Sequence, residues 1–305
     1  MLGKKGKNPV SSESDMLLRK IEKTKMKQGK GFKLMPFKHI LLHLDATEQC
    51  AKRVKIALDL AKNGNAHLRA LFSQTDPGMS AIVGSHPVGS DLRKLGAAAE
   101  ESFMASAKEA GVDASVTSVL ATSHAQVIQA VTWASRTSDI AILGQYDWSK
   151  NYSALPSDLA ENIIIHSGRP ALVVPFAGEF PTIGKRCLVA WNGGRESARA
   201  LNDAIPLMIG AKIVEIFAIQ KDGVKRPSEK ELVAHLDTYG IPSKAAHATR
   251  DNVSVTDLLL SHAADESSDL IVMGAHGHYG VSHMLKGGNT REILKHMTVP
   301  VLMSH

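Results

Sequence analysis

Residues 269–305 read DLIVMGAHGHYGVSHMLKGGNTREILKHMTVPVLMSH, and their pattern decides the fold. Two short apolar runs, 269–273 and 299–303, are rich in β-type residues and predict two strands. Between them, residues 290–297 have the apolar spacing of a short helix. A strand, a helix and a second strand in this order form the crossover that parallel strands require.

Glycines mark the loop that joins the first of these strands to the helix: Gly274, Gly277, Gly287 and Gly288. A phosphate group can approach such a backbone closely because glycine has no Cβ atom. Free N–H groups at the following helix N-terminus, together with the Thr290 hydroxyl, would add partners for phosphate oxygens. Glycines alone are equally typical of a flexible loop with tight turns, so their spacing must decide.

The spacing resembles the ATP-binding signature of the universal stress protein family, which is Gly-x-x-Gly, nine residues, then Gly and a small residue. Here it reads Gly274-Ala-His-Gly277, then residues 278–286, then Gly287-Gly288-Asn-Thr. Family members usually carry Ser or Thr where this chain has Gly288, which keeps the backbone amide and removes one hydroxyl contact. The resemblance covers residues 36–305 and implies ATP or AMP as the ligand, with or without Mg²⁺.

Length and composition indicate a globular protein of about two domains, because the chain has 305 residues and 44% of them are hydrophobic. No apolar run approaches the roughly 18 residues of a membrane span, and the basic first residues lack the apolar core of a signal peptide. Cys50 and Cys187 form no CxxC pair, which argues against a disulfide framework. We therefore expect a cytoplasmic protein without a membrane partner.

The net charge of +6 comes from the first 34 residues. They hold ten of the 36 Lys and Arg residues and three of the 30 Asp and Glu residues, so 26 basic and 27 acidic residues remain. Such a tail is typical of a disordered or marginally helical segment. A nucleic-acid-binding arm is one interpretation, and a solvated tail or an extended translation start before Met35 is the one we favour. Nucleic acid is therefore not an expected partner.

Strand and helix patterns alternate from Lys38 onward, which indicates an α/β fold with a parallel sheet covered on both faces. A first series predicts strands at 38–45, 67–73, 114–120, 139–143 and 170–174, and helices at 48–62, 91–109, 124–135 and 157–166. A second series predicts strands at 186–191, 212–219, 243–247, 269–273 and 299–303, and helices at 196–208, 228–239, 253–264 and 290–297.

The two series match as an internal repeat. Asp45 matches Asn192 at an offset of 147 residues, and Gly144 matches Gly274 at an offset of 130. We predict two tandem, doubly wound domains with five parallel strands each, at 36–178 and 184–305, after a tail at 1–35. The resemblance implies that they are Rossmann-like, as in the adenine nucleotide alpha hydrolases, and that the repeats pair as two chains of a homodimer do in single-domain family members.

The copies differ where phosphates would lie. At the positions of Gly277, Gly287, Gly288 and Thr290, the first repeat has Asp147, Ser157, Asp158 and Ala160. Carboxylates repel phosphates, so we predict that the first repeat binds no nucleoside triphosphate in this way and has a structural role.

The resemblance implies the strand order 3-2-1-4-5, which places the first and fourth strands side by side at the switch point where ligands bind. Asn192 stands where family members have an aspartate beside the adenine and ribose, and Ala218 would line the adenine pocket. The predicted nucleotide-binding residues are Ala190, Asn192, Ala218, Met273, Gly274, His276, Gly277, Gly287, Gly288, Asn289 and Thr290.

Other chemistry finds less support. His276, His278 and His283 have no nearby Cys or acid to complete a metal site. Residues 192–197 loosely resemble the Ser-Gly-Gly-x-Asp-Ser loop of ATP pyrophosphatases, but both Ser and Asp are replaced. No catalytic constellation emerges, so an AMP-forming enzyme or a slow ATPase is a lesser alternative.

The sequence thus predicts a nucleotide-dependent regulatory module of the stress response, with an unknown protein partner and possible homodimerisation. The alternative is a scaffold that has lost ATP, because Gly288 and Asn192 depart from the family pattern. The pattern names neither the stress nor the partner.

Overall fold

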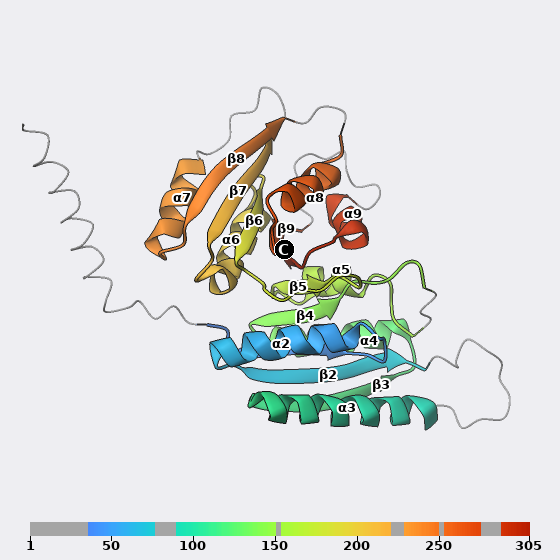
Figure 1. Ribbon diagram of the computed structural model, residues 1–305. Coiled ribbons are helices and arrows are strands. Elements are labelled where there is room, and N and C mark those ends of the chain that lie inside the picture. Colours follow the sequence, from blue (N-terminus) through green and yellow to red (C-terminus); the bar gives the residue numbers. More distant parts are fainter. Residues whose placement is uncertain (1–35, 77–89, 151–153, 221–228, 250–252, 276–287) are drawn as a thin grey trace, which may run out of the picture. The chain divides into compact units, whose positions relative to one another are not determined.

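The computed structural model describes residues 36–76, 90–150, 154–220, 229–249, 253–275 and 288–305 (Figure 1). The predicted basic tail, most of the loop at 75–90, and residues 276–287 of the glycine loop lie outside the described residues. The description below takes the N-terminal half as residues 36–178 and the C-terminal half as residues 184–305.

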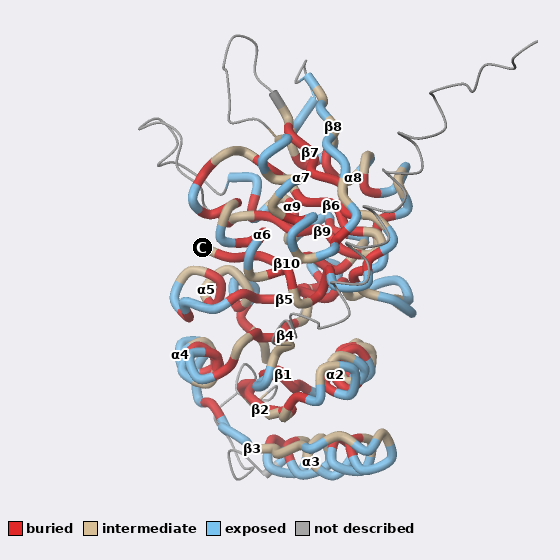
Figure 2. Tube along the Cα trace, turned by 90° about the vertical axis from the view of Figure 1, so that its left-hand side faces the viewer, coloured by how far each residue is buried: buried red, intermediate tan, exposed pale blue. Residues whose placement is uncertain are grey.

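Strands and helices alternate in the N-terminal half, as predicted. Its elements are β1 (His39–Leu44), α2 (Cys50–Gly64), β2 (His67–Thr75), α3 (Ser90–Ala110), β3 (Ala114–Ala121), α4 (His124–Arg136), β4 (Ile140–Gly144), α5 (Leu159–His166) and β5 (Ala171–Val174). Figure 2 shows α2 and α3 on one side of these strands and α4 and α5 on the other, each with its buried side turned inward. The sheet of this half is therefore covered on both faces.

The C-terminal half repeats this order. Its elements are β6 (Arg186–Trp191), α6 (Arg195–Met208), β7 (Ile213–Gln220), α7 (Glu229–Thr238), β8 (Ser243–Thr249), α8 (Val255–Asp265), β9 (Leu270–Gly274), α9 (Asn289–His296) and β10 (Val301–Ser304). Figure 1 shows α7 on one side of β7 and β8, with α8 and α9 on the other. Of the helices that the structure describes, none has the length and apolar character that crossing a membrane requires.

All ten of these strands belong to one sheet, in the order β3-β2-β1-β4-β5-β10-β9-β6-β7-β8. Pairs within each half are parallel, and β5 and β10 pair antiparallel, with Val173 opposite Val301. Each half therefore has the strand order 3-2-1-4-5, which confirms the prediction. The chain reverses direction across the sheet between β1 and β4, and again between β6 and β9, so each half has a switch point at those carboxyl ends.

Hydrophobic burial explains why these segments are strands. The residues of β4 and β5 are apolar and, except for the terminal Gly144, buried on both faces of the sheet, as expected for strands covered by helices on both sides. Helix starts follow from local capping. Ser123 accepts a hydrogen bond from the Gln126 N–H (3.3 Å), and Ser254 accepts one from the Asp257 N–H (3.0 Å).

Four predicted element starts were two residues too early, those of α2, α5, α8 and β10. Helix α8 begins at Val255 rather than at 253, because Ser254 is its cap. Strand β10 begins at Val301 rather than at 299, because Pro300 has no N–H to donate to a ladder. The other boundaries agree with the sequence prediction within about two residues.

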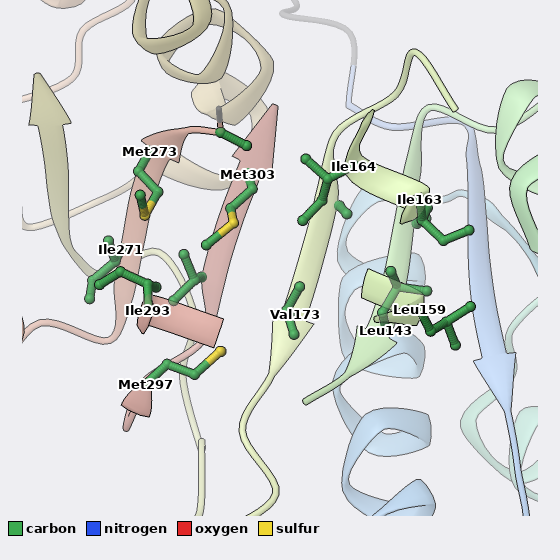
Figure 3. Packing of buried hydrophobic residues seen from close by; sticks show 14 of the residues in the cluster. Leu143, Leu159, Ile163, Ile164, Val173, Ile271, Met273, Ile293, Met297 and Met303 are labelled. Carbon is green, nitrogen blue, oxygen red and sulfur yellow. The ribbon is translucent and has the colours of Figure 1, made fainter. Parts of the chain in front are cut away.

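The hydrophobic core continues across the seam between β5 and β10 (Figure 3). Val173 and Met303 lie on the two paired strands and are fully buried, and Ile163 of α5 and Ile293 of α9 belong to the same cluster. Met297 and Met303 are core residues as well, since they are 4% and 0% exposed. One apolar cluster thus joins the two switch points.

Candidate functional site

Strands β6 and β9 bring three of the predicted binding residues onto adjacent strands. Ala190 of β6 lies opposite Met273 of β9 in the parallel register. On the other side of β6, Trp191 lies opposite Ala218 of β7. All of these residues stand near the carboxyl ends of their strands, which is where open α/β sheets bind ligands.

Gly274 ends β9 at a place where only glycine fits. A Cβ atom there would lie 2.5 Å from the backbone of Glu196 and Ser197, at the start of α6. The strand end and the α6 N-terminus are therefore in direct backbone contact. This contact explains the glycine at 274 independently of any ligand.

Asn192 follows β6 and organises the turn into α6. Its Oδ1 accepts a hydrogen bond from the Gly194 N–H at 2.8 Å, and Gly193 between them has a φ of +74° that favours glycine. Within the described residues, the Asn192 side chain makes no other hydrogen bond. The amide nitrogen is the part of Asn192 that a ligand could engage.

A buried carboxylate stands beside this turn. Glu196 is 5% exposed and accepts a hydrogen bond from the Arg195 side chain at 2.5 Å. Burial opposes its ionisation, but the hydrogen bonds from Arg195 and from its own backbone, with the nearby positive charges, lower the pKa of Glu196. The Glu196 charge is thus matched locally by Arg195, whose side chain is 82% exposed at this edge.

The first turn of α9 forms the other described part of the site. Gly288 is the N-cap residue and has no side chain that could accept a hydrogen bond from the first N–H groups of the helix, while its carbonyl oxygen accepts one from the Arg291 N–H at 2.9 Å. Gly288 and Asn289 are exposed, and Thr290 is 5% exposed. Such a helix start can hold an anion through its N–H groups and the helix dipole.

Three predicted site residues, His276, Gly277 and Gly287, lie outside the described residues. The structure therefore describes eight of the eleven predicted residues and brings those on β6, β7 and β9 together.

The matching edge of the N-terminal half, at the ends of β1 and β4, holds a cluster of buried charged side chains. Arg53 of α2 donates from Nη2 to the Asp45 carboxylate, and both side chains are 3% exposed. The Thr47 N–H donates to the second carboxylate oxygen at 2.9 Å. A Cβ atom on Gly144 would collide with the Arg53 guanidinium, so that glycine is required by the packing of Arg53.

Burial and charge set the ionisation of this cluster. Burial opposes the charge on both Asp45 and Arg53, but their mutual attraction prevails, so the pKa of Asp45 is lowered and that of Arg53 is raised. Burial lowers the pKa of His43, so the ring is neutral near pH 7 and its Nε2 donates to the Ser73 carbonyl oxygen at 2.8 Å. The 3.9 Å approach of His43 to Asp45 is therefore not an ion pair.

Comparison with known proteins identifies the C-terminal half. Residues 184–305 match the model of the universal stress protein family. The C-terminal half therefore has the sequence of a universal stress protein domain. A universal stress protein of Synechocystis sp. is 27% identical over 175 residues, which make up 54% of this chain and 57% of that protein. The chain thus spans little more than half the length of this curated relative.

Solved structures share the fold over most of this chain. One from Archaeoglobus fulgidus DSM 4304 has a TM-score of 0.66 at 18% identity, with 87% of this chain and 95% of that chain covered. A protein from Pseudomonas aeruginosa UCBPP-PA14 assigned to the same family has a TM-score of 0.56 at 15% identity, with 88% and 93% covered. At these identities the likeness establishes the fold alone.

The sequence prediction missed Arg53. A basic residue on a helix usually marks a solvated face, so nothing in the local pattern indicates a buried guanidinium. Its signal lies in the repeat: Arg53 stands eight residues after Asp45, and the residue at the matching position of the second series is Ala200. Gln145, which directly follows Gly144, was also missed, because its partners, the carbonyl oxygens of Leu294 and Lys295, are distant in the sequence.

Proposed function

We propose that this protein binds ATP or AMP, with or without Mg²⁺, at the carboxyl ends of β6 and β9. The residues proposed to line this site are Ala190, Asn192, Ala218, Met273, Gly274, His276, Gly277, Gly287, Gly288, Asn289 and Thr290.

The observation that carries the proposal is the difference in side-chain size between the two switch points. Three matching positions, each offset by 147 residues, hold His43, Asp45 and Arg53 in the N-terminal half and Ala190, Asn192 and Ala200 in the C-terminal half. The N-terminal set fills its edge with an imidazole and a guanidinium, both buried. The alanines of the second set are smaller side chains, and we propose that a base and a sugar lie against them beside β6.

The phosphate end differs in charge as well. Gly288 and Arg291, at the start of α9, match Asp158 and Glu161 at the start of α5, at an offset of 130 residues. Arg291 is already paired with Glu161, with 2.6 Å between Nε and Oε2. The uncapped start of α9 by itself favours a phosphate, whereas the Asp158 carboxylate at the start of α5 disfavours it. We therefore propose one nucleotide per chain, in the C-terminal half.

Regulation would follow from the place of α9. The proposed phosphates would contact the first turn of α9, and the last turn of α9 contacts the N-terminal half. Gln145 donates from Nε2 to the carbonyl oxygens of Leu294 and Lys295, both at 3.0 Å. We propose that residues 36–178 and 184–305 are tandem domains, and that nucleotide occupancy biases their binding to a protein partner during stress.

Titration of nucleotide-free protein with ATP and AMP tests the site, with a matched pair of variants at one position. Gly288 is suited to this because a Cβ atom there would meet nothing within 4 Å. Gly288→Asp copies the N-terminal half and should weaken ATP binding by about tenfold or more, because it places a carboxylate beside the phosphates. Gly288→Ser should bind ATP at least as tightly as the wild type, since a hydroxyl can serve as both cap and phosphate ligand. Equal ATP affinity in the wild type and Gly288→Asp would contradict the proposed phosphate position.

A scaffold without nucleotide is the competing function. It is favoured by Asn192, which carries no negative charge and uses its Oδ1 within the turn. If neither the wild type nor Gly288→Ser bound ATP or AMP, the scaffold would be the better account.

A further inference from the structure

The two outermost strands of the sheet that the structure describes are β3 and β8, and each is paired on one side only. Figure 2 shows exposed residues on β3, at the lower end of the sheet. An outer strand can pair with a strand of another molecule through its free backbone groups, and proteins usually prevent this with charged side chains or proline. The two outer strands differ in this protection.

Strand β8 carries charged side chains that hold ion pairs. The Nζ atom of Lys244 lies 2.9 Å from a carboxylate oxygen of Glu215 and 3.0 Å from one of Glu266. The Nδ1 atom of His247 lies 3.6 Å from a carboxylate oxygen of Glu229. A strand that paired with β8 would have to bury or displace these charges, which is costly. This edge is therefore protected.

Strand β3 lacks this protection. Its sequence is ASVTSVLA, which includes no charged residue, proline or glycine. Residues 117–120 are exposed, and among them Val119 is 39% and Leu120 38% exposed. Valine and threonine favour strands, so this uncharged edge is well suited to pair with another strand.

The outward-facing backbone groups of β3 belong to alternate residues. The Asp113 carbonyl oxygen accepts a hydrogen bond from the Leu68 N–H of β2 at 2.9 Å, so the backbone groups of residue 113 face β2. Successive residues of a strand direct these groups to opposite sides, and β3 keeps one register with β2 along its whole length. The N–H and C=O groups of Val116, Ser118 and Leu120 therefore face away from β2, toward the open edge.

We propose that the β3 edge is an interface between two copies of this chain, whose β3 strands pair antiparallel about a two-fold axis at Ser118. Two identical surfaces that pair in this way form a closed dimer. Leu120 of one copy lies opposite Val116 of the other, and Val119 lies opposite Thr117, so apolar and β-branched side chains meet. Neither strand is charged, so no like charges are opposed. This interface does not depend on the proposed ATP site.

Helix α3 supports a second copy as the partner, because its charges are complementary about the same axis. The Ser118 Oγ donates to the Glu100 carboxylate of α3, and a Cβ atom on Gly96 would lie 3.5 Å from this Oγ. A two-fold axis at Ser118 therefore places residues before Gly96 of one copy opposite residues after Gly96 of the other. Arg93 comes before this point and Glu101 after it, and both are exposed. Opposite charges thus face each other across the interface.

Sedimentation velocity of the full chain over a range of concentrations tests the proposal. The wild type should sediment as a dimer at micromolar concentration. The double variant Val119→Lys, Leu120→Lys should weaken dimerisation about tenfold or more, because lysines protect an outer strand from pairing. Both side chains are exposed, so the fold should be kept, which circular dichroism would show. The matched control is Ala245→Lys, Thr249→Lys, at exposed positions of β8, and it should dimerise as the wild type does.

Two cysteine variants locate the axis, since Cys50 and Cys187 are both buried. Ser118→Cys should form a disulfide-linked dimer on mild oxidation, because the two Cα atoms at the axis would be about 5.5 Å apart. Val116→Cys should form almost none, because its two copies would be about 13 Å apart. Non-reducing electrophoresis measures both. A wild type that stays monomeric up to millimolar concentration, a dimer unaffected by the β3 lysines, or equal cross-linking of the two cysteine variants would overturn the proposal.

Discussion

The ends of β1 and β6 occupy matching places in the two halves but hold different groups. After β1 the chain buries a neutral imidazole, a carboxylate and a guanidinium, from His43, Asp45 and Arg53. After β6 the matching positions hold Ala190, Asn192 and Ala200, and the polar member of the set is half-buried. The difference shows that two switch points with the same strand order can carry different side chains. One holds a buried ion pair, and the other holds small side chains beside which we propose that a ligand binds.

Removing the Asp45 charge should give the largest change in the free energy of unfolding. Asp45→Asn copies the C-terminal half and leaves the Arg53 guanidinium buried without a counterion, so we expect the free energy of unfolding to fall by about 3–5 kcal/mol. Chemical denaturation measures this. The double variant Asp45→Asn, Arg53→Ala copies both C-terminal residues and should recover part of the loss. The reverse change, Asn192→Asp, should alter stability by about 1 kcal/mol or less. Equal losses in the two halves would contradict the comparison.

The next largest change in the free energy of unfolding should come from substituting one of the two glycines at the ends of the proposed ATP site. Gly274→Ala places a methyl group against the α6 backbone and should lower the free energy of unfolding by about 3 kcal/mol. Gly288→Ala enters open space and should change it by about 0.5 kcal/mol or less. Thermal and urea unfolding of both variants would show this. Similar effects at both positions would mean that α6 can move away from β9.

Loss of the Gln145 side chain should have an intermediate effect. This amide bonds the carbonyl oxygens of Leu294 and Lys295 and accepts from the Phe176 N–H at 3.1 Å, so Gln145→Ala should cost about 2 kcal/mol. The matching residue after β9 is Ala275, which makes no such contact through its side chain. Gln129→Ala, at an exposed position of α4, is the control and should leave the unfolding midpoint unchanged. A loss as small as that of the control would show that α9 is held by its apolar contacts alone.

The smallest effect should be a pH dependence that one half has and the other lacks. The pKa of His43 is lowered by burial, whereas unfolded His43 takes up a proton as the pH falls through about 6.5. The unfolded state then binds more protons, so stability decreases as the pH drops below that value. His43→Gln cannot titrate and should remove about 1 kcal/mol of this decrease. Urea unfolding above and below the transition measures it for both proteins. Identical slopes would mean that His43 is protonated in the folded state.

Much of the fold could be predicted from the sequence, because strands buried on both faces leave continuous apolar runs. Residues 186–191 were predicted as a strand and are β6. The repeated pattern also predicted all the remaining described helices and strands. The strand order came from the family resemblance and was confirmed. The missed starts of α8 and β10 depend on one capping serine and one proline, whose effects are local.

The sites could be predicted less completely, because their decisive contacts join distant residues. Nothing in the local sequence indicates that Arg53 lies on Gly144, or that Lys295 stacks on Trp148, 147 residues away. The acids at Asp147 and Asp158 did indicate that the N-terminal half disfavours phosphates. They gave no sign of a cavity beside them, which α9 of the other half completes.

The most direct measurement is the nucleotide content of freshly purified protein, found by denaturing it and chromatographing the supernatant. The account predicts about one ATP or AMP per chain in the wild type and almost none in Gly288→Asp, with both proteins equally folded by circular dichroism. Two nucleotides per chain would show that the N-terminal edge is not blocked by Arg53 and its acids. No nucleotide in the wild type, and no binding of added ATP, would contradict the claim that the C-terminal half leaves its switch point to a ligand.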